Sequence, residues 1–185
     1  LLPAGRPAIM PSTEFRIMSA QELSDIVMYI RTQPPVDAST QPPVLGPLGK
    51  VLVATGQIPF SADALASATD HIALPPVAEV SLDFGAHLAA PCTGCHGPAL
   101  TGGPIPGGDP SWVAARNLTP SEDGMAGWSF ADFEGAMREG VRPDGTALQM
   151  PMTLALPYTS RLTDVEMEAL WVYLSALDPL PTGAS

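Results

Sequence analysis

The chain is short of cysteines, of basic residues and of long apolar runs. Its 185 residues include only two cysteines, which excludes a fold held together by several disulfides. Lys and Arg number 8 against 19 Asp and Glu, giving a formal charge of −11. Binding to nucleic acid is therefore not expected, because neutralising phosphates takes clusters of basic side chains. An acidic surface suits a protein partner with a basic patch, and it equally serves solubility alone.

Segments that direct a chain to or across a membrane are also missing. No apolar run approaches the roughly 20 residues of a membrane span, and no signal-peptide pattern is present. The sequence starts Leu1-Leu2-Pro3 without Met. We therefore expect a segment to precede it, which leaves room for a membrane tether upstream.

Proline and glycine, by contrast, are abundant, with 22 and 17 residues. This composition favours irregular backbone and argues against an extensive sheet. Capping residues and apolar stripes at helical spacing predict four helices instead. The expected helices start after Ser19, Ser81, Ser129 and Thr163 and run to about residues 32, 89, 139 and 178.

The same pattern divides the chain into three parts. Residues 1–33 read as the end of a domain, residues 34–80 as an extended Pro-rich linker, and residues 81–180 as one domain. Within the linker, residues 49–55 predict a short helix or strand, and residues 62–68 predict a helical turn.

Residues 92–96 read Cys-Thr-Gly-Cys-His, and the domain is organised around them. A C-x-x-C-H run is the attachment signal of a c-type haem. Two thiols three positions apart can add to the two vinyl groups on one edge of the porphyrin, and the adjacent His then directs a ring nitrogen at the iron. A thioredoxin-like redox pair would need a βαβ setting, and a zinc site would need more ligands. His71 and His87 lie upstream without ligand spacing, so we expect neither to bind a metal.

The first and last expected helices form an internal repeat. The capping box, the apolar stripe and a tyrosine recur in one register: Ser19 matches Thr163, Glu22 matches Glu166, and Tyr29 matches Tyr173. Residues 1–33 thus resemble the tail of a second copy of the domain. Either the sequence is a fragment of a two-haem protein, or a degenerate first domain has lost its haem. We favour the fragment, because a lone terminal helix cannot bury its apolar stripe.

These features together resemble a known family. Residues 81–178 resemble a class I (mitochondrial-type) cytochrome c domain of the bacterial kind, and the chain as a whole looks like the C-terminal part of a two-haem c-type cytochrome. The resemblance implies an all-α cytochrome c fold, a small helical bundle around one covalently bound haem c, with the first and last helices crossing near Gly85 and Trp171. It rests on the haem motif, Asn117-Leu-Thr-Pro120, Gly127-Trp128, Asp132-Phe133, the turn Pro143-Asp-Gly145, a Met-Pro region and Tyr173-Leu174.

The resemblance also implies a set of haem ligands. Cys92 and Cys95 would form the thioether bonds, and His96 would be the proximal ligand of the iron. The sixth ligand should be a Met, whose thioether stabilises ferrous iron. We favour Met152 for its spacing from the final helix and from the turn, while Met150 is the alternative because it precedes a proline.

Further residues receive roles by the same resemblance. Met10 would be the ligand of an absent first haem. Asn117 would help to hold the loop, and Trp128 would either donate to a haem propionate or lie in the core. The carbonyl of Pro106 or Pro110 should accept a hydrogen bond from the other ring nitrogen of the proximal His. Both candidate methionines are alternatively core fillers, which would leave the iron open.

The expected function is electron transfer by a periplasmic protein, or one on the periplasmic face of the inner membrane. It would carry single electrons through a His/Met-ligated haem between redox partners, with no catalysis of its own. One alternative is a haem-containing subunit of an oxidoreductase or peroxidase with an open iron site. Another is a structural module of a larger complex, docked through residues 1–80.

Overall fold

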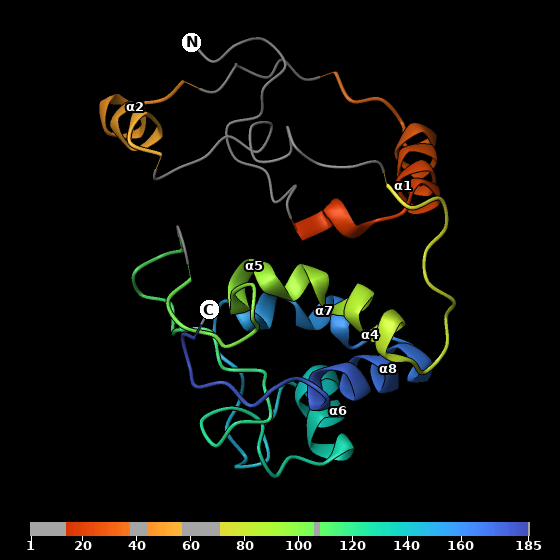
Figure 1. Ribbon diagram of the computed structural model, residues 1–185. Helices are drawn as coiled ribbons and strands as arrows, with labels where there is room; N and C mark the ends of the chain where they lie inside the picture. The colour runs from red at the N-terminus through yellow and green to blue at the C-terminus, as the bar shows by residue number, and fades with distance from the viewer. Residues whose placement is uncertain (1–13, 38–43, 57–70, 106–107, 185) are drawn as a thin grey trace. The chain divides into compact units, whose positions relative to one another are not determined.

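The computed structural model describes residues 14–37, 44–56, 71–105 and 108–184. It divides into two compact units, residues 1–75 and 76–185. In the described residues every regular element is a helix, and β-structure is limited to the isolated bridges Gly103–Ala115 and Val141–Ala147 (Figure 1). The expectation of an all-α fold is confirmed.

The first unit contains η1 (Glu14–Ile17), α1 (Ala20–Thr32) and α2 (Pro47–Ala54). The expected capping box opens α1: the Ser19 hydroxyl accepts from the Glu22 N–H at 3.2 Å, and the Glu22 carboxylate accepts from the Ser19 N–H at 2.7 Å. The predicted short helix or strand at 49–55 is a helix that begins at a proline, Pro47. The turn expected at 62–68 lies outside the described residues.

Residues 71–73 bind the start of α1. The carbonyls of Ile72 and Ala73 accept from the N–H groups of Ala20 and Gln21, at 2.8 and 3.2 Å. The exposed ring of His71 hydrogen-bonds the carbonyl oxygen of Met18 through Nδ1, at 2.7 Å. This end of the predicted linker is thus tied to the first helix by backbone contacts that composition alone did not indicate.

The second unit carries the remaining helices. Ser81, Ser129 and Thr163 cap their helices as expected, each accepting from a backbone N–H of the first turn. The final helix ends at Ser175, a little before the predicted end at about residue 178. The elements are α4 (Leu82–Ala89), η2 (Ala90–Cys92), α5 (Thr93–His96), α6 (Phe130–Glu139), η3 (Met152–Leu154), α7 (Leu156–Thr159) and α8 (Asp164–Ser175).

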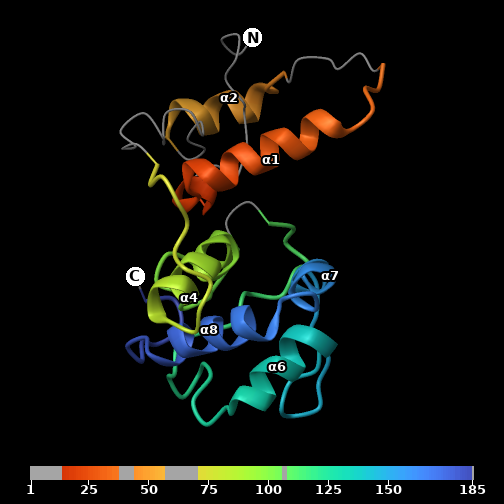
Figure 2. The same cartoon turned by 90° about the vertical axis from the view of Figure 1, so that its right-hand side faces the viewer.

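Helices α4 and α8 cross in close contact, and α6 packs against α8 (Figure 2). A Cβ atom at Gly85 would lie 2.2 Å from the carbonyl oxygen of Ala169 and 2.6 Å from Cβ of Tyr173. The crossing expected near Gly85 and Trp171 is confirmed, because Ala169 and Tyr173 lie on either side of Trp171 in α8. The Trp171 ring itself packs on Phe133 of α6, with centroids 5.5 Å apart and planes tilted by 35°.

The core of this unit lies where α4, α6 and α8 meet the long loop that follows the haem motif. We call its buried apolar residues the core cluster. Packing at this cluster stabilises the unit, because each fully buried large apolar side chain contributes about 1.5–3 kcal/mol relative to exposure. The core cluster consists of Ala89, Leu100, Met125, Phe133, Met137, Met167, Leu170 and Leu174.

Candidate haem-binding site

The Cys-x-x-Cys-His motif forms one continuous helical stretch across η2 and α5. Cys92 is partly buried and packs against the core cluster, whereas Cys95 is exposed. Positions three apart on a helical turn are neighbours on one face, so the two sulfur atoms belong to the same side of the turn. Both cysteines lie in the described part of the chain, and neither is in a disulfide. The arrangement leaves two thiols for one edge of a porphyrin.

The ring of His96 is buried and oriented by the backbone. Its Nδ1 lies 2.7 Å from the carbonyl oxygen of Arg116. Because a carbonyl can only accept, Nδ1 carries the hydrogen and Nε2 keeps a lone pair. A metal-binding His is typically fixed in this way by a donor bond from its other nitrogen. Nε2 is therefore the atom available to a metal.

The acceptor differs from the predicted one. We expected a proline carbonyl of the loop, at Pro106 or Pro110, and this was wrong: the acceptor belongs to Arg116. The reason is the path of the loop. Gly103 and Ala115 pair through two backbone hydrogen bonds of 2.9 Å, which brings the residue after Ala115 under the imidazole.

The Arg116 carbonyl is held by backbone on both sides. Gly102 has a φ of +71°, and a Cβ there would lie 2.4 Å from the Ala115 carbonyl oxygen and 2.7 Å from that of Arg116. On the other side, the Leu118 N–H donates to the Leu100 carbonyl at 2.8 Å. The hydrogen bond to His96 is thus set by the rigid backbone of two loop segments.

Burial sets the protonation states of the motif. It lowers the pKa of His96 below its ordinary value, and the hydrogen bond to the Arg116 carbonyl partly offsets this change. The imidazole is therefore neutral at neutral pH, which is the form that binds metals. Burial also raises the pKa of the Cys92 thiol to about 11, with a further contribution from the nearby Cys95. In the polypeptide alone, the Cys92 sulfur stays a neutral thiol.

The two candidate methionines have different surroundings. Met152, the first residue of η3, is partly buried and packs against the core cluster. Met150 is 43% exposed, and its sulfur accepts a hydrogen bond from the Thr153 hydroxyl at 2.9 Å. The structure therefore brings Met152 and Cys92 against the same cluster. Met10 lies outside the described residues.

Asn117 is almost fully buried, and its side chain is occupied by the protein. Its amide donates to Ser121 Oγ at 3.0 Å and to the Leu180 carbonyl at 2.8 Å. Its carbonyl accepts from the N–H and hydroxyl of Thr119, both at 2.8 Å. Asn117 thus holds the loop and binds it to the C-terminal tail, while Trp128 is partly buried against the core cluster.

Sequence reasoning missed several residues around this site. Arg116 binds His96 through its backbone carbonyl, and the sequence of side chains does not indicate which carbonyl does so. Arg138 forms contacts with the segment before α8, and its only sequence signal was the i, i+4 spacing from Glu134. Asp123 anchors the tail by accepting from the Thr182 N–H at 2.7 Å.

The residues present fit a c-type haem. Such a haem uses two thiols, an imidazole nitrogen and a thioether. The chain offers two cysteines on one helical turn, a neutral His whose backbone hydrogen bond involves Nδ1 and not Nε2, and a partly buried Met. Three of these side chains, Cys92, His96 and Met152, are at least partly buried.

Comparison with known proteins agrees with this geometry. The family model for cytochrome c matches residues 83–178, just over half of the chain. The chain belongs to the cytochrome c family, whose members carry electrons on a covalently bound haem c.

Similar proteins are subunits of dehydrogenases. A nicotinate dehydrogenase subunit of Pseudomonas putida is 39% identical over 108 residues, covering 54% of this chain and 9% of the relative. The cytochrome c subunit of the quinone-dependent alcohol dehydrogenase of Gluconacetobacter polyoxogenes is 33% identical over 127 residues, covering 63% of this chain and 26% of the relative. The fructose dehydrogenase cytochrome subunit of Gluconobacter japonicus is 33% identical over 95 residues, covering 47% of this chain and 19% of the relative.

The chain spans about a quarter or less of the length of each of these relatives. In the part of the chain that the structure describes, the helices are too short or too polar to cross a membrane.

Proposed function

We propose that this chain is the haem-bearing part of a periplasmic c-type cytochrome that passes single electrons between redox partners. The observation that carries the proposal is the geometry of His96, whose buried, neutral ring donates from Nδ1 to the Arg116 carbonyl and keeps Nε2 for an iron. The haem supplies the chemistry, because its iron alternates between the ferric and ferrous states. The chain supplies attachment, ligands and surroundings.

Each residue of the site has a distinct part in this proposal. Cys92 and Cys95 anchor the cofactor through their sulfur atoms. The Arg116 carbonyl orients the His96 ring and increases the basicity of Nε2. Met152 donates its sulfur as the sixth ligand, and a thioether favours the ferrous state and so raises the reduction potential.

The proposed partner is a dehydrogenase, and the proposed location is the periplasm or the periplasmic face of the inner membrane. Three relatives from three genera are named as subunits of dehydrogenases. The formal charge of −11 would favour docking to a basic patch on such a partner.

We also propose that residues 1–33 are the end of a preceding cytochrome c-like domain, as their repeat with α8 indicates. Helices α1 and α8 share the same capping box, and Met167, Leu170 and Leu174 of α8 are buried. The equivalent side chains of α1 are not: Ile26 and Ile30 are 42% and 61% exposed. In a complete preceding domain, a helix equivalent to α4 would cover these exposed side chains of α1. The haem content of the native gene product separates the two forms of this proposal: a further haem would support a fragment of a two-haem protein, and a single haem would support a degenerate first domain that has lost its haem.

The optical spectrum tests the ligands directly. A ferric haem bound by His and Met should show the weak far-red band of Met-to-iron charge transfer, together with a low-spin spectrum. A high-spin spectrum without this band would reject Met ligation and support the alternative of an open-iron oxidoreductase or peroxidase subunit.

A further inference from the structure

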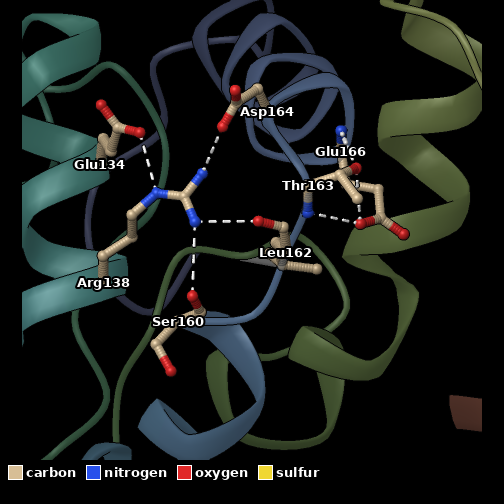
Figure 3. Close-up of polar contacts among 7 residues, drawn as sticks. All are labelled: Glu134, Arg138, Ser160, Leu162, Thr163, Asp164 and Glu166. Carbon is tan, nitrogen blue, oxygen red and sulfur yellow. Dashed lines mark hydrogen bonds and ion pairs between the residues drawn. The ribbon is translucent and has the colours of Figure 1, made fainter.

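Arg138 of α6 makes a fork of contacts with the segment that leads into α8 (Figure 3). Its Nη1 donates to the carbonyl oxygens of Leu162 at 2.9 Å and Ser160 at 3.3 Å. Its Nη2 lies 2.9 Å from the Asp164 carboxylate, and its Nε lies 2.8 Å from that of Glu134. One guanidinium therefore ties α6 to three positions of another segment.

The contact with the Leu162 carbonyl matters most, because the contact with the Ser160 carbonyl is longer and exposed to solvent. The Asp164 side chain is 99% exposed, so its ion pair with Arg138 is screened by solvent and contributes little. The Leu162 contact is partly buried, and hydrogen bonds from a charged guanidinium to carbonyl groups are stronger than those between neutral groups. The planar fork also fixes the direction of both bonds, which a lysine cannot reproduce.

The same end of α6 also holds the segment that carries Met152 at both of its ends. The Gly140 carbonyl accepts from the Leu148 N–H at 2.7 Å, and the Met137 carbonyl accepts from the Thr159 hydroxyl at 2.7 Å. Between these anchors lie only η3 and α7, of three and four residues. Such short helices have few internal hydrogen bonds, so the position of the segment depends on its anchors.

We propose that Arg138 is a positioning residue for the sixth ligand. By holding residues 160–162 against α6, it keeps the Met152 segment closed and the thioether at the iron. The inference rests on the proposed ligation by Met152. Loss of the fork should loosen the thioether in the ferric state first, because a thioether binds ferric iron less tightly than ferrous iron.

Binding of imidazole to the intact ferric holoprotein measures this effect, because imidazole must displace the thioether. For Arg138→Gln we expect the dissociation constant of imidazole to fall about tenfold, as expected for the loss of charge-assisted bonds. The far-red band should weaken in parallel. Arg138→Lys keeps the charge but has a single donor nitrogen in place of three, so it should give an intermediate value.

Arg161→Gln is the matched control. Arg161 is an exposed arginine within the same segment, so its replacement removes the same charge without removing the fork. Its imidazole affinity should stay within about twofold of wild type, as is usual for exposed positions. If Arg138→Gln binds haem too poorly to be measured, Arg138→Lys alone decides: an unchanged affinity for imidazole would overturn the proposal.

Met152→Ala separates this inference from the proposed function. If Met152→Ala binds imidazole more tightly than wild type and Arg138→Gln binds it as wild type does, the role of Arg138 is overturned. The assignment of Met152 as the sixth ligand would then stand. Unchanged imidazole binding by Met152→Ala would instead reject Met152 as the ligand, and the proposal for Arg138 with it.

Discussion

Met150 and Met152 are two residues apart, yet their side chains have different surroundings. Met152 packs against the core cluster, as Cys92 does, whereas Met150 is exposed and accepts a hydrogen bond from Thr153. Spacing from the turn and from Thr163 favoured Met152, and the following proline kept Met150 as the alternative. The side-chain surroundings support the proposed ligation by Met152.

This difference predicts the outcome of two single substitutions. Met152→Ala should abolish the far-red band and lower the reduction potential, because ferrous iron loses its thioether ligand. Met150→Ala is the matched control and should retain both. Spectra and redox titration of the two variants check the assignment, and a band that persists in Met152→Ala but is lost in Met150→Ala would reverse it.

The backbone around His96 shows where sequence reasoning reaches its limit at the residue scale. The motif identified Cys92, Cys95 and His96 from their spacing alone. The acceptor for the imidazole could not be found in this way, because any residue offers a carbonyl and only the path of the loop selects Arg116. Arg138 was missed for a related reason: two of its partners are carbonyls.

At the scale of elements, the helices were predictable because their signals are local. Ser19, Ser81, Ser129 and Thr163 all cap helices that the capping patterns and apolar stripes had indicated. Contacts between elements were harder to predict from the sequence. The crossing near Gly85 and Trp171 was predicted, but the sequence did not show which side chains meet there: Ala169 and Tyr173 lie opposite Gly85, and the Trp171 ring packs on Phe133 of α6.

The crossing of α4 and α8 predicts opposite effects for two glycine substitutions. Gly85→Ala should destabilise the domain by about 1–3 kcal/mol, the usual cost of overpacking, because the new methyl group meets backbone at 2.2 Å. Gly135→Ala in α6 should stabilise it by about 0.5–1 kcal/mol, since Cβ there has ordinary space, 3.9 Å from its nearest neighbour. Denaturant unfolding of the holoprotein measures both, and equal stabilities of the two variants would argue against the crossing.

The contact between the loop and the C-terminal tail predicts that the stability of the domain depends on pH. Asp123 accepts from the Thr182 N–H at 2.7 Å and from Ser121 Oγ at 2.8 Å, and these bonds lower its pKa to about 2. Because this pKa lies below the usual value near 4 of an unfolded chain, the stabilisation is present above about pH 4 and is lost as the pH falls towards 2. Asp123→Asn should therefore flatten this part of the stability profile.

Thermal unfolding between pH 5 and pH 2 measures the effect. Glu122→Gln, at the exposed neighbouring position, is the control and should keep the slope of the wild-type protein. An unchanged slope in Asp123→Asn would show that the anchor between the loop and the tail does not contribute to the acid sensitivity of the fold.

At the scale of the whole molecule, charge is the property most relevant to a carrier. The formal charge is −11 with only eight basic residues, and Arg138 is engaged in ion pairs with Glu134 and Asp164. A surface of this kind accelerates encounter with a basic partner over distances of about the Debye length, ~8 Å at physiological salt.

The rate of electron transfer with a basic partner should therefore fall as ionic strength rises. Stopped-flow reduction by a cationic and by an anionic small-molecule reductant provides a matched comparison, in which the two salt dependences should have opposite signs. A flat profile with the cationic reagent would reject electrostatic steering and leave the charge to serve solubility.

The central claim is that one haem is attached covalently to Cys92 and Cys95, and the intact mass of the denatured holoprotein tests it most directly. We expect the mass of the polypeptide plus one haem, with no titratable thiol remaining. The mass of the bare polypeptide, with both thiols free, would contradict the account.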